Sequence, residues 1–133
     1  MATTFGPAWF NIPVEDVDKT RQFYKALGFK LNGRRQSAEL VSFLVGANEM
    51  VVHFFRRKVF EQSTKGKAAN AKKGSELMIT IGSKTKQQIN SVAKKVKAAG
   101  GKVFIEPSES PEGYYGCAFS DPDGHKWNLL LIE

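Results

Sequence analysis

Apolar and polar residues alternate along two short segments of the chain, residues 9–14 and 76–81. An alternation with a period of two is typical of a strand that buries only one of its faces. One face carries Phe10, Ile12 and Val14 in the first segment and Leu77, Ile79 and Ile81 in the second. Because Pro13 cannot donate a backbone hydrogen bond, we expect the first strand at a sheet edge or unpaired at that position.

Each of these strands is followed by a segment whose apolar residues recur at the spacing of a helix. The helical stripes are Val17, Thr20, Phe23, Tyr24 and Leu27 in the first half and Ile89, Val92, Ala93, Val96 and Ala99 in the second. Asp16 is a suitable N-cap for the first helix, and Ser83 or Thr85 for the second. Gly28 and Gly100 follow the stripes, as residues that end a helix in the left-handed conformation.

Three further strands are predicted after each helix, near residues 29–35, 39–46 and 49–56 and near residues 102–106, 114–120 and 125–132. The order βαβββ therefore occurs twice, although two such halves can also look alike by chance. We predict an α+β fold in which two βαβββ modules form a cup-shaped mixed sheet with the helices outside. A chain of 133 residues is one domain, with module 1 at about 8–56, a basic linker at 57–74 and module 2 at about 75–133.

The composition is that of a globular protein, with 41% hydrophobic and 25% charged residues. No run approaches the roughly 20 apolar residues that a membrane-spanning helix needs, so we expect no membrane partner. The first residues lack a charged region followed by an apolar stretch, and we expect no secretory leader. A single cysteine, Cys117, suits a reducing compartment, which predicts a cytoplasmic location, and it is expected to be a small core residue.

The net charge of +7 is concentrated in one segment. Residues 56–74 carry seven basic side chains against a single acidic one, Glu61. The simplest interpretation is a solvated loop that also aids solubility, and the alternative is attraction of an anionic small molecule or a partner surface. No recognition motif accompanies the charge, so we expect no nucleic-acid partner.

Three groups of motif residues together extend over essentially the whole chain. They are Asn11-Ile-Pro-Val14 with Asp16, Phe23-Tyr24 before Leu27-Gly28-Phe29, and Phe119-Ser-Asp-Pro-Asp-Gly-His-Lys-Trp-Asn128. In this order and spacing the chain resembles the vicinal oxygen chelate (VOC) superfamily, the glyoxalase, bleomycin-resistance and extradiol-dioxygenase group. It looks most like the branch of predicted lactoylglutathione lyases. The resemblance implies two βαβββ modules that form a cup, and usually a homodimer.

In the metal-dependent members of that superfamily, four side chains converge on a divalent ion, and the resemblance places these positions at Trp9, His53, Glu76 and Asn128. Trp9 offers only an N–H donor, and Asn128 offers a neutral carbonyl oxygen, a poor ligand for a transition metal. His53 and Glu76 are competent ligands, but two fall short of the usual three. We expect either no cofactor or a divalent metal ion (Zn, Ni, Mn or Fe) held by His53 and Glu76. His125 is expected on the opposite strand face from Asn128.

Each candidate also has a plain structural interpretation. Trp9 can simply be an aromatic wall, and His53 can be satisfied by one hydrogen bond. Glu76 can form an ion pair with His53 or with an arginine such as Arg34 or Arg35. A carboxylate that faces a partly apolar cup nevertheless needs a partner or a role, so Glu76 stays a candidate for function.

Two functional hypotheses follow, and the sequence leaves open whether the protein is an enzyme. In the first, the cup binds a small polar substrate and the protein is a lyase or isomerase of the lactoylglutathione lyase type. Glu76 would act as the general base at a carbon beside a carbonyl. His53, or a metal ion bound to both residues, would stabilise the resulting enediolate.

In the second hypothesis the cup is a metal-free receptor that binds or sequesters a drug or metabolite. Its walls would be Trp9, Phe55 and Met78, and its polar contacts Asn11, His53, Glu76 and Asn128. The basic segment would favour an anionic ligand. Whether the cup closes within one chain or between two chains is open.

Overall fold

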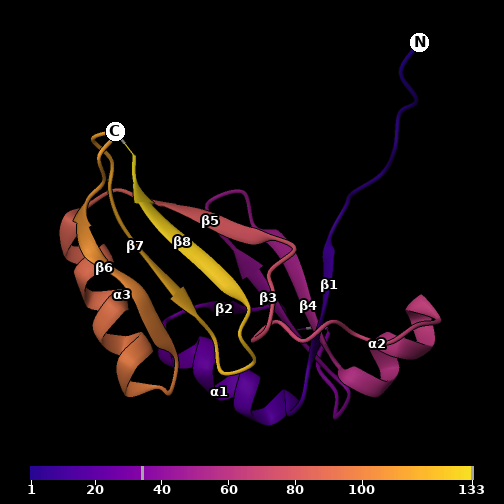
Figure 1. Cartoon of the computed structure of the whole chain (residues 1–133). Helices are drawn as coiled ribbons and strands as arrows, with labels where there is room; N and C mark the ends of the chain where they lie inside the picture. The colour runs from indigo at the N-terminus through magenta and orange to yellow at the C-terminus, as the bar shows by residue number, and fades with distance from the viewer. Residues whose placement is uncertain (34, 133) are drawn as a thin grey trace.

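The described part of the chain forms two four-stranded sheets and three helices, an α+β arrangement (Figure 1). The computed structural model describes residues 1–33 and 35–132. The βαβββ order occurs twice, as predicted. The elements are β1 (Phe10–Val14), α1 (Val17–Ala26), β2 (Lys30–Leu31), β3 (Leu40–Val45), β4 (Met50–Arg56), α2 (Arg57–Thr64), β5 (Met78–Ser83), α3 (Lys86–Ala98), β6 (Lys102–Glu109), β7 (Tyr115–Ser120) and β8 (Lys126–Leu131).

Each module builds one mixed sheet, which we call the first and the second sheet. Their strand orders are β1-β4-β3-β2 and β5-β8-β7-β6. In both, the first strand of the module runs parallel to the last, and the last runs antiparallel to the strand before it. This register sets Asn11 beside His53 and Thr80 beside Asn128. The strand with Pro13 lies at a sheet edge, as predicted.

The predicted helix ends are confirmed by local geometry. The Asp16 carboxylate accepts a hydrogen bond from the Lys19 amide at 3.1 Å, and Thr85 is the cap of α3, accepting from the Gln88 amide at 3.1 Å. Gly28 follows α1 with φ of 92°, in the left-handed region where glycine is favoured. The two helices are therefore specified by residues next to them in the sequence.

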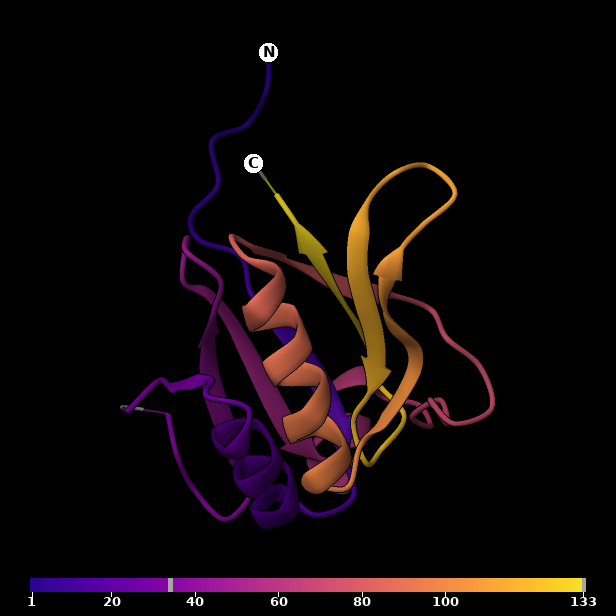
Figure 2. The same ribbon diagram turned by 90° about the vertical axis from the view of Figure 1, so that its left-hand side faces the viewer.

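One core joins the two sheets. Helix α1 packs on β3 and β4, α3 packs on the second sheet, and Figure 2 shows the two helices beside each other in front of the sheets. Tyr24 of α1 is fully buried, and its ring centroid lies 4.8 Å from that of Phe54 and 5.6 Å from that of Trp127. Alternate strand residues point to opposite faces. The sheet faces that carry His53 and Asn128 therefore point away from the shared core.

A buried polar network crosses this core. The Tyr24 hydroxyl donates to the Asp121 carboxylate at 2.6 Å and accepts from the Trp127 indole N–H at 2.8 Å. Burial is the main cause that raises the pKa of Asp121, and burial also raises the pKa of Tyr24. Nε2 of His125 lies 2.6 Å from the carbonyl oxygen of Pro13, so this histidine links the last turn to β1.

Three local features differ from the sequence-based prediction. The strand predicted near 29–35 is limited to β2, because the Arg35 amide donates to the Asn32 carbonyl and closes a turn there. The segment predicted as a basic linker contains an eight-residue helix, α2. Strand β5 begins at Met78, so Glu76 precedes the strand. None of the described helices is long and apolar enough to cross a membrane.

Candidate functional site

A cavity of about 720 Å³ lies over the uncovered face of the first sheet. Four residues that were predicted to contact a ligand lie in its wall, because strand alternation places them on that face or beside it. They are Trp9, Asn11, His53 and Phe55. The lining residues are Trp9, Asn11, Asn32, Arg35, Leu40, Val51, His53, Phe55, Phe60, Ser63 and Thr64. The wall therefore combines aromatic surface with several hydrogen-bond donors.

His53 lies on β4 and lines this cavity, and its titratable side chain is partly buried. Its Nδ1 lies 2.9 Å from the hydroxyl oxygen of Ser42 on the neighbouring strand. The rings of Trp9 and Phe55 flank it edge-on, with centroids 6.1 Å and 5.8 Å away. Burial lowers the pKa of His53, and the positive charge of Arg35 lowers it further. Both effects favour the neutral form of the imidazole.

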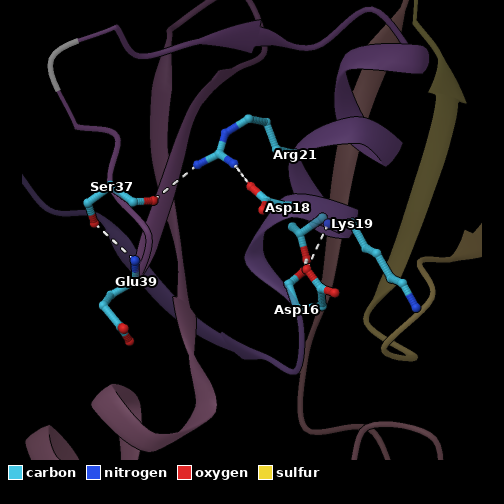
Figure 3. A network of polar contacts seen from close by, with 7 residues as sticks. Asp16, Asp18, Lys19, Arg21, Ser37 and Glu39 are labelled. Atoms are coloured by element: carbon cyan, nitrogen blue, oxygen red, sulfur yellow. Dashed lines mark hydrogen bonds and ion pairs between the residues drawn. The ribbon is translucent and has the colours of Figure 1, made fainter.

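The loop between β2 and β3 carries Arg35 to the cavity. It is tied to α1, because Arg21 pairs with Asp18 and donates to the Ser37 carbonyl at 3.2 Å (Figure 3). The Gln36 amide donates to the backbone carbonyls of Asn32 and Ser42, at 2.7 Å and 3.0 Å. These bonds attach the loop to both the helix and the sheet, and so position a guanidinium group beside the cavity.

The other predicted site residues lie elsewhere. Glu76 is exposed and lines a second cavity of about 340 Å³, which shares Asn11, Phe60 and Thr64 with the first. Within the described residues, no hydrogen bond or ion pair joins Glu76 to His53. Arg34, one of its predicted partners, lies outside the described residues.

Met78 and Asn128 belong to the uncovered face of the second sheet. Met78 is 52% exposed and Asn128 is partly buried. This face points away from the shared core, as the face with His53 does. The structure therefore gathers Trp9, Asn11, His53 and Phe55 in one cavity and leaves Glu76, Met78 and Asn128 outside it.

The donor set of one chain does not suit the divalent metal ion that the superfamily resemblance implies. Among residues 1–33 and 35–132, no three His, Cys, Asp or Glu side chains lie close enough together to hold an ion. His53 and Glu76 line different cavities, and the indole of Trp9 cannot coordinate a cation. The described part of one chain thus does not bring together the three protein ligands of a catalytic zinc or iron site.

Sequence reasoning missed several residues of the cavity wall. Phe60, Ser63 and Thr64 come from α2, in the segment predicted as a linker. Ser42 pairs directly with His53 in the β3–β4 register, and Asn32 reaches it from the adjoining loop. A serine at a fully buried position of an apolar strand was a usable signal, because a buried hydroxyl needs a partner. Its partner could be named only from the register.

Two βαβββ modules that each build a four-stranded mixed sheet define a class of α+β proteins. The sequence profile of the Glyoxalase/Bleomycin resistance protein/Dioxygenase superfamily matches residues 6–129, and the chain belongs to this superfamily. No match was found among curated proteins.

Solved structures agree with this assignment. A hypothetical protein from S. aureus is 35% identical with a TM-score of 0.86, covering 98% of this chain and 96% of its own. A glyoxalase-related enzyme from Fulvimarina pelagi is 16% identical with a TM-score of 0.80, and the match covers 96% of this chain and 89% of that enzyme. A bleomycin-binding protein, solved in complex with bleomycin, is 20% identical with a TM-score of 0.63, and the match covers 97% of this chain and 100% of that protein. The last two share the fold.

Proposed function

We propose that this protein binds a small anionic molecule with an apolar or aromatic part, in the cavity over the first sheet. The observation that carries the proposal is the guanidinium of Arg35 beside a cavity in which none of the described lining residues is acidic. Lys67, from the basic segment, lines the neighbouring second cavity and adds to the positive field. An anion is the ligand that such an arrangement favours.

The apolar part of the ligand is inferred from the wall. Trp9, Phe55 and Phe60 offer ring surfaces on which a planar or aliphatic group can pack. Trp9 is 52% exposed and so retains surface to bury against a ligand. The bleomycin-binding relative shows that a protein of this fold can hold a drug-sized molecule.

The binding hypothesis is preferred to the isomerase hypothesis on geometric grounds. General base catalysis requires Glu76 within hydrogen-bond reach of the reacting carbon's proton, in the site that also holds His53. One chain places these two side chains in different cavities. The narrower resemblance to lactoylglutathione lyases stays a prediction.

Matched aromatic probes test the proposed function. We expect 2-naphthoate to bind more tightly than 2-naphthamide, which has the same shape without the charge. A hydrogen bond to a charged group contributes about 1.5–3 kcal/mol, so Arg35→Gln should weaken naphthoate binding about tenfold or more. Lys58→Gln removes the same charge from an exposed residue that does not line the cavity, and serves as the control. Calorimetric titration measures all of these affinities.

Equal affinity for the acid and the amide would contradict the anionic ligand. Chelator treatment and metal analysis of freshly purified protein address the isomerase directly. Naphthoate binding that survives the chelator supports a metal-free receptor. Turnover of a methylglyoxal–thiol adduct that requires a divalent metal ion and is lost in Glu76→Gln would favour the isomerase instead.

We also propose that two copies pair, so that the second sheet of one copy covers the cavity face of the other. Several large apolar side chains of module 2 are exposed, namely Leu77, Met78, Phe104, Ile105 and Tyr114, between 41% and 57%. Exposed apolar surface on this scale is typical of an interface. Such pairing would bring Met78 and Asn128 of one copy to His53 of the other and close the cup.

Light scattering coupled to size-exclusion chromatography tests this pairing. We expect a dimer, and we expect Met78→Glu to shift it to monomer because a carboxylate would be buried in the interface. Ser91→Glu adds the same charge on an exposed position of α3 and should leave the dimer unchanged. A monomeric native protein would contradict the pairing.

A further inference from the structure

The inference concerns Ser42, a residue of the first sheet beneath the cavity, and it rests on the proposed function. Ser42 has no exposed surface. Its hydroxyl oxygen lies 3.2 Å from Nδ2 of Asn32 and 2.9 Å from Nδ1 of His53. The three side chains therefore form a hydrogen-bonded relay that runs from the loop through the sheet to the cavity.

The direction of this relay follows from the chemistry of its first member. The amide nitrogen of Asn32 can only donate, so the Ser42 oxygen accepts that bond. The Ser42 hydroxyl hydrogen then needs an acceptor, because a buried donor without one costs about 1–3 kcal/mol. Among the residues that the structure describes, the other partner of this hydroxyl is Nδ1 of His53. Nδ1 therefore carries the lone pair, and Nε2 carries the hydrogen.

We propose that Ser42 and Asn32 hold His53 as its Nε2–H tautomer, so that His53 donates a hydrogen bond to the anionic oxygen of a ligand beside Arg35. Ser42 and Asn32 are positioning residues, because they act through His53. His53 then selects a ligand that presents an acceptor, and carboxylate, sulfonate or phosphate groups supply one. The same tautomer is unsuited to a metal ion or to a general base, both of which need the lone pair at Nε2.

Backbone bonds make the relay rigid. Ser42 and His53 are direct partners in the antiparallel register of β3 and β4. The backbone N–H of Asn32 donates to the backbone carbonyl of Ser42 at 2.9 Å, and the side-chain amide of Gln36 donates to the backbone carbonyls of both residues. Each member is thus held by a second interaction, which makes the orientation of the His53 ring a property of the free protein. The tautomer can be measured without any ligand.

Nitrogen-15 NMR of the imidazole rings is the first test. The chain has two histidines, so His125→Gln assigns the signals of His53 by elimination. At pH 7.5 we expect the wild-type protein to show a protonated Nε2 and an unprotonated Nδ1 at His53. The opposite tautomer would overturn the proposal, because it would make Ser42 the acceptor and give Nε2 the lone pair.

Ser42→Ala is the second test, with Ser83→Ala as the matched control. Ser83 is also a buried serine, but it bonds to the backbone of Thr85 and lies outside the cavity. We expect Ser42→Ala to mix the tautomers of His53 and to weaken 2-naphthoate binding about two- to tenfold, the range of one neutral hydrogen bond. We expect Ser83→Ala to change neither. An unchanged tautomer in Ser42→Ala would overturn the positioning role.

The two proposals fail in distinguishable ways. If 2-naphthoate binds and discrimination against the amide is seen, but NMR finds Nδ1–H, the relay is wrong and the proposed function stands. The other case is a free protein that has Nε2–H but binds 2-naphthoate no more tightly than 2-naphthamide. The donor role of His53 and the proposed function are then both wrong, and only the hydrogen-bonded relay remains.

Discussion

The chemistry of His53 is set by its neighbours rather than by its residue type. A histidine in the cup of this superfamily suggests a metal ligand, and the sequence alone allowed that role. In the structure it lies on Ser42, between Trp9 and Phe55, with the charge of Arg35 close enough to disfavour its protonation. These surroundings keep the imidazole neutral and suit it to hydrogen bonding.

At this scale we predict how the pKa of His53 responds to Arg35. Burial and Arg35 both lower it, so its NMR titration midpoint should fall below the ordinary value of about 6.5. Arg35→Gln removes the charge but leaves the burial, which is the larger cause. The midpoint should therefore rise in that variant and still remain below the ordinary value. Lys58→Gln should leave it unchanged, and a midpoint insensitive to Arg35 would contradict the assigned cause.

Helix α2 is an element whose role could not be predicted from its composition. Its basic residues indicated a solvated linker, yet Phe60, Ser63 and Thr64 form one wall of the cavity. None of its residues is fully buried. Its contribution to the stability of the fold is therefore small, while its contribution to the binding surface is direct.

For this element we predict that Phe60→Ala separates binding from stability. Burying a phenylalanine ring against a ligand contributes about 1.5–3 kcal/mol, so affinity for 2-naphthoate should fall about tenfold or more. The melting temperature should change little, because Phe60 is only partly buried in the free protein. Lys58→Ala, on the same helix outside the cavity, controls for helix propensity. A large drop in melting temperature would show that α2 belongs to the core instead.

The whole molecule is organised around contacts between its two modules. Tyr24 of the first module packs against Trp127 of the second and donates a hydrogen bond to Asp121. Because neither sheet has a complete core of its own, the two modules should unfold together.

We therefore predict that Tyr24→Phe destabilises the entire protein. It leaves Asp121 and the Trp127 indole without their buried partner, which should cost about 1–3 kcal/mol of unfolding free energy. Circular dichroism and tryptophan fluorescence should still report one coincident urea transition. Tyr115→Phe, which removes an exposed hydrogen bond to Asn90, should have a negligible effect. Separate transitions for the two probes would contradict the shared core.

Local signals made most of the fold predictable. The N-caps Asp16 and Thr85, the left-handed Gly28 and the edge strand with Pro13 all depend on residues near each other in the chain. The candidate site was predictable in part, since alternation placed Trp9 and Asn11 on one face and the superfamily resemblance implied Trp9 and His53 as cup positions. Ser42 was missed because its role depends on strand register. Arg35 was expected only as a partner of Glu76, because its place in the His53 cavity depends on the path of a loop.

The sequence by itself determined the doubled βαβββ order and the faces of the strands, because periodicity and capping are local properties. The superfamily was indicated by the resemblance of its motifs. Only the tertiary structure decided that His53 and Glu76 line different cavities and that Arg35 and α2 complete the first one. The physical reason is the packing of Tyr24 against Trp127, which joins residues far apart in the chain. That long-range contact sets the direction in which each sheet presents its uncovered face.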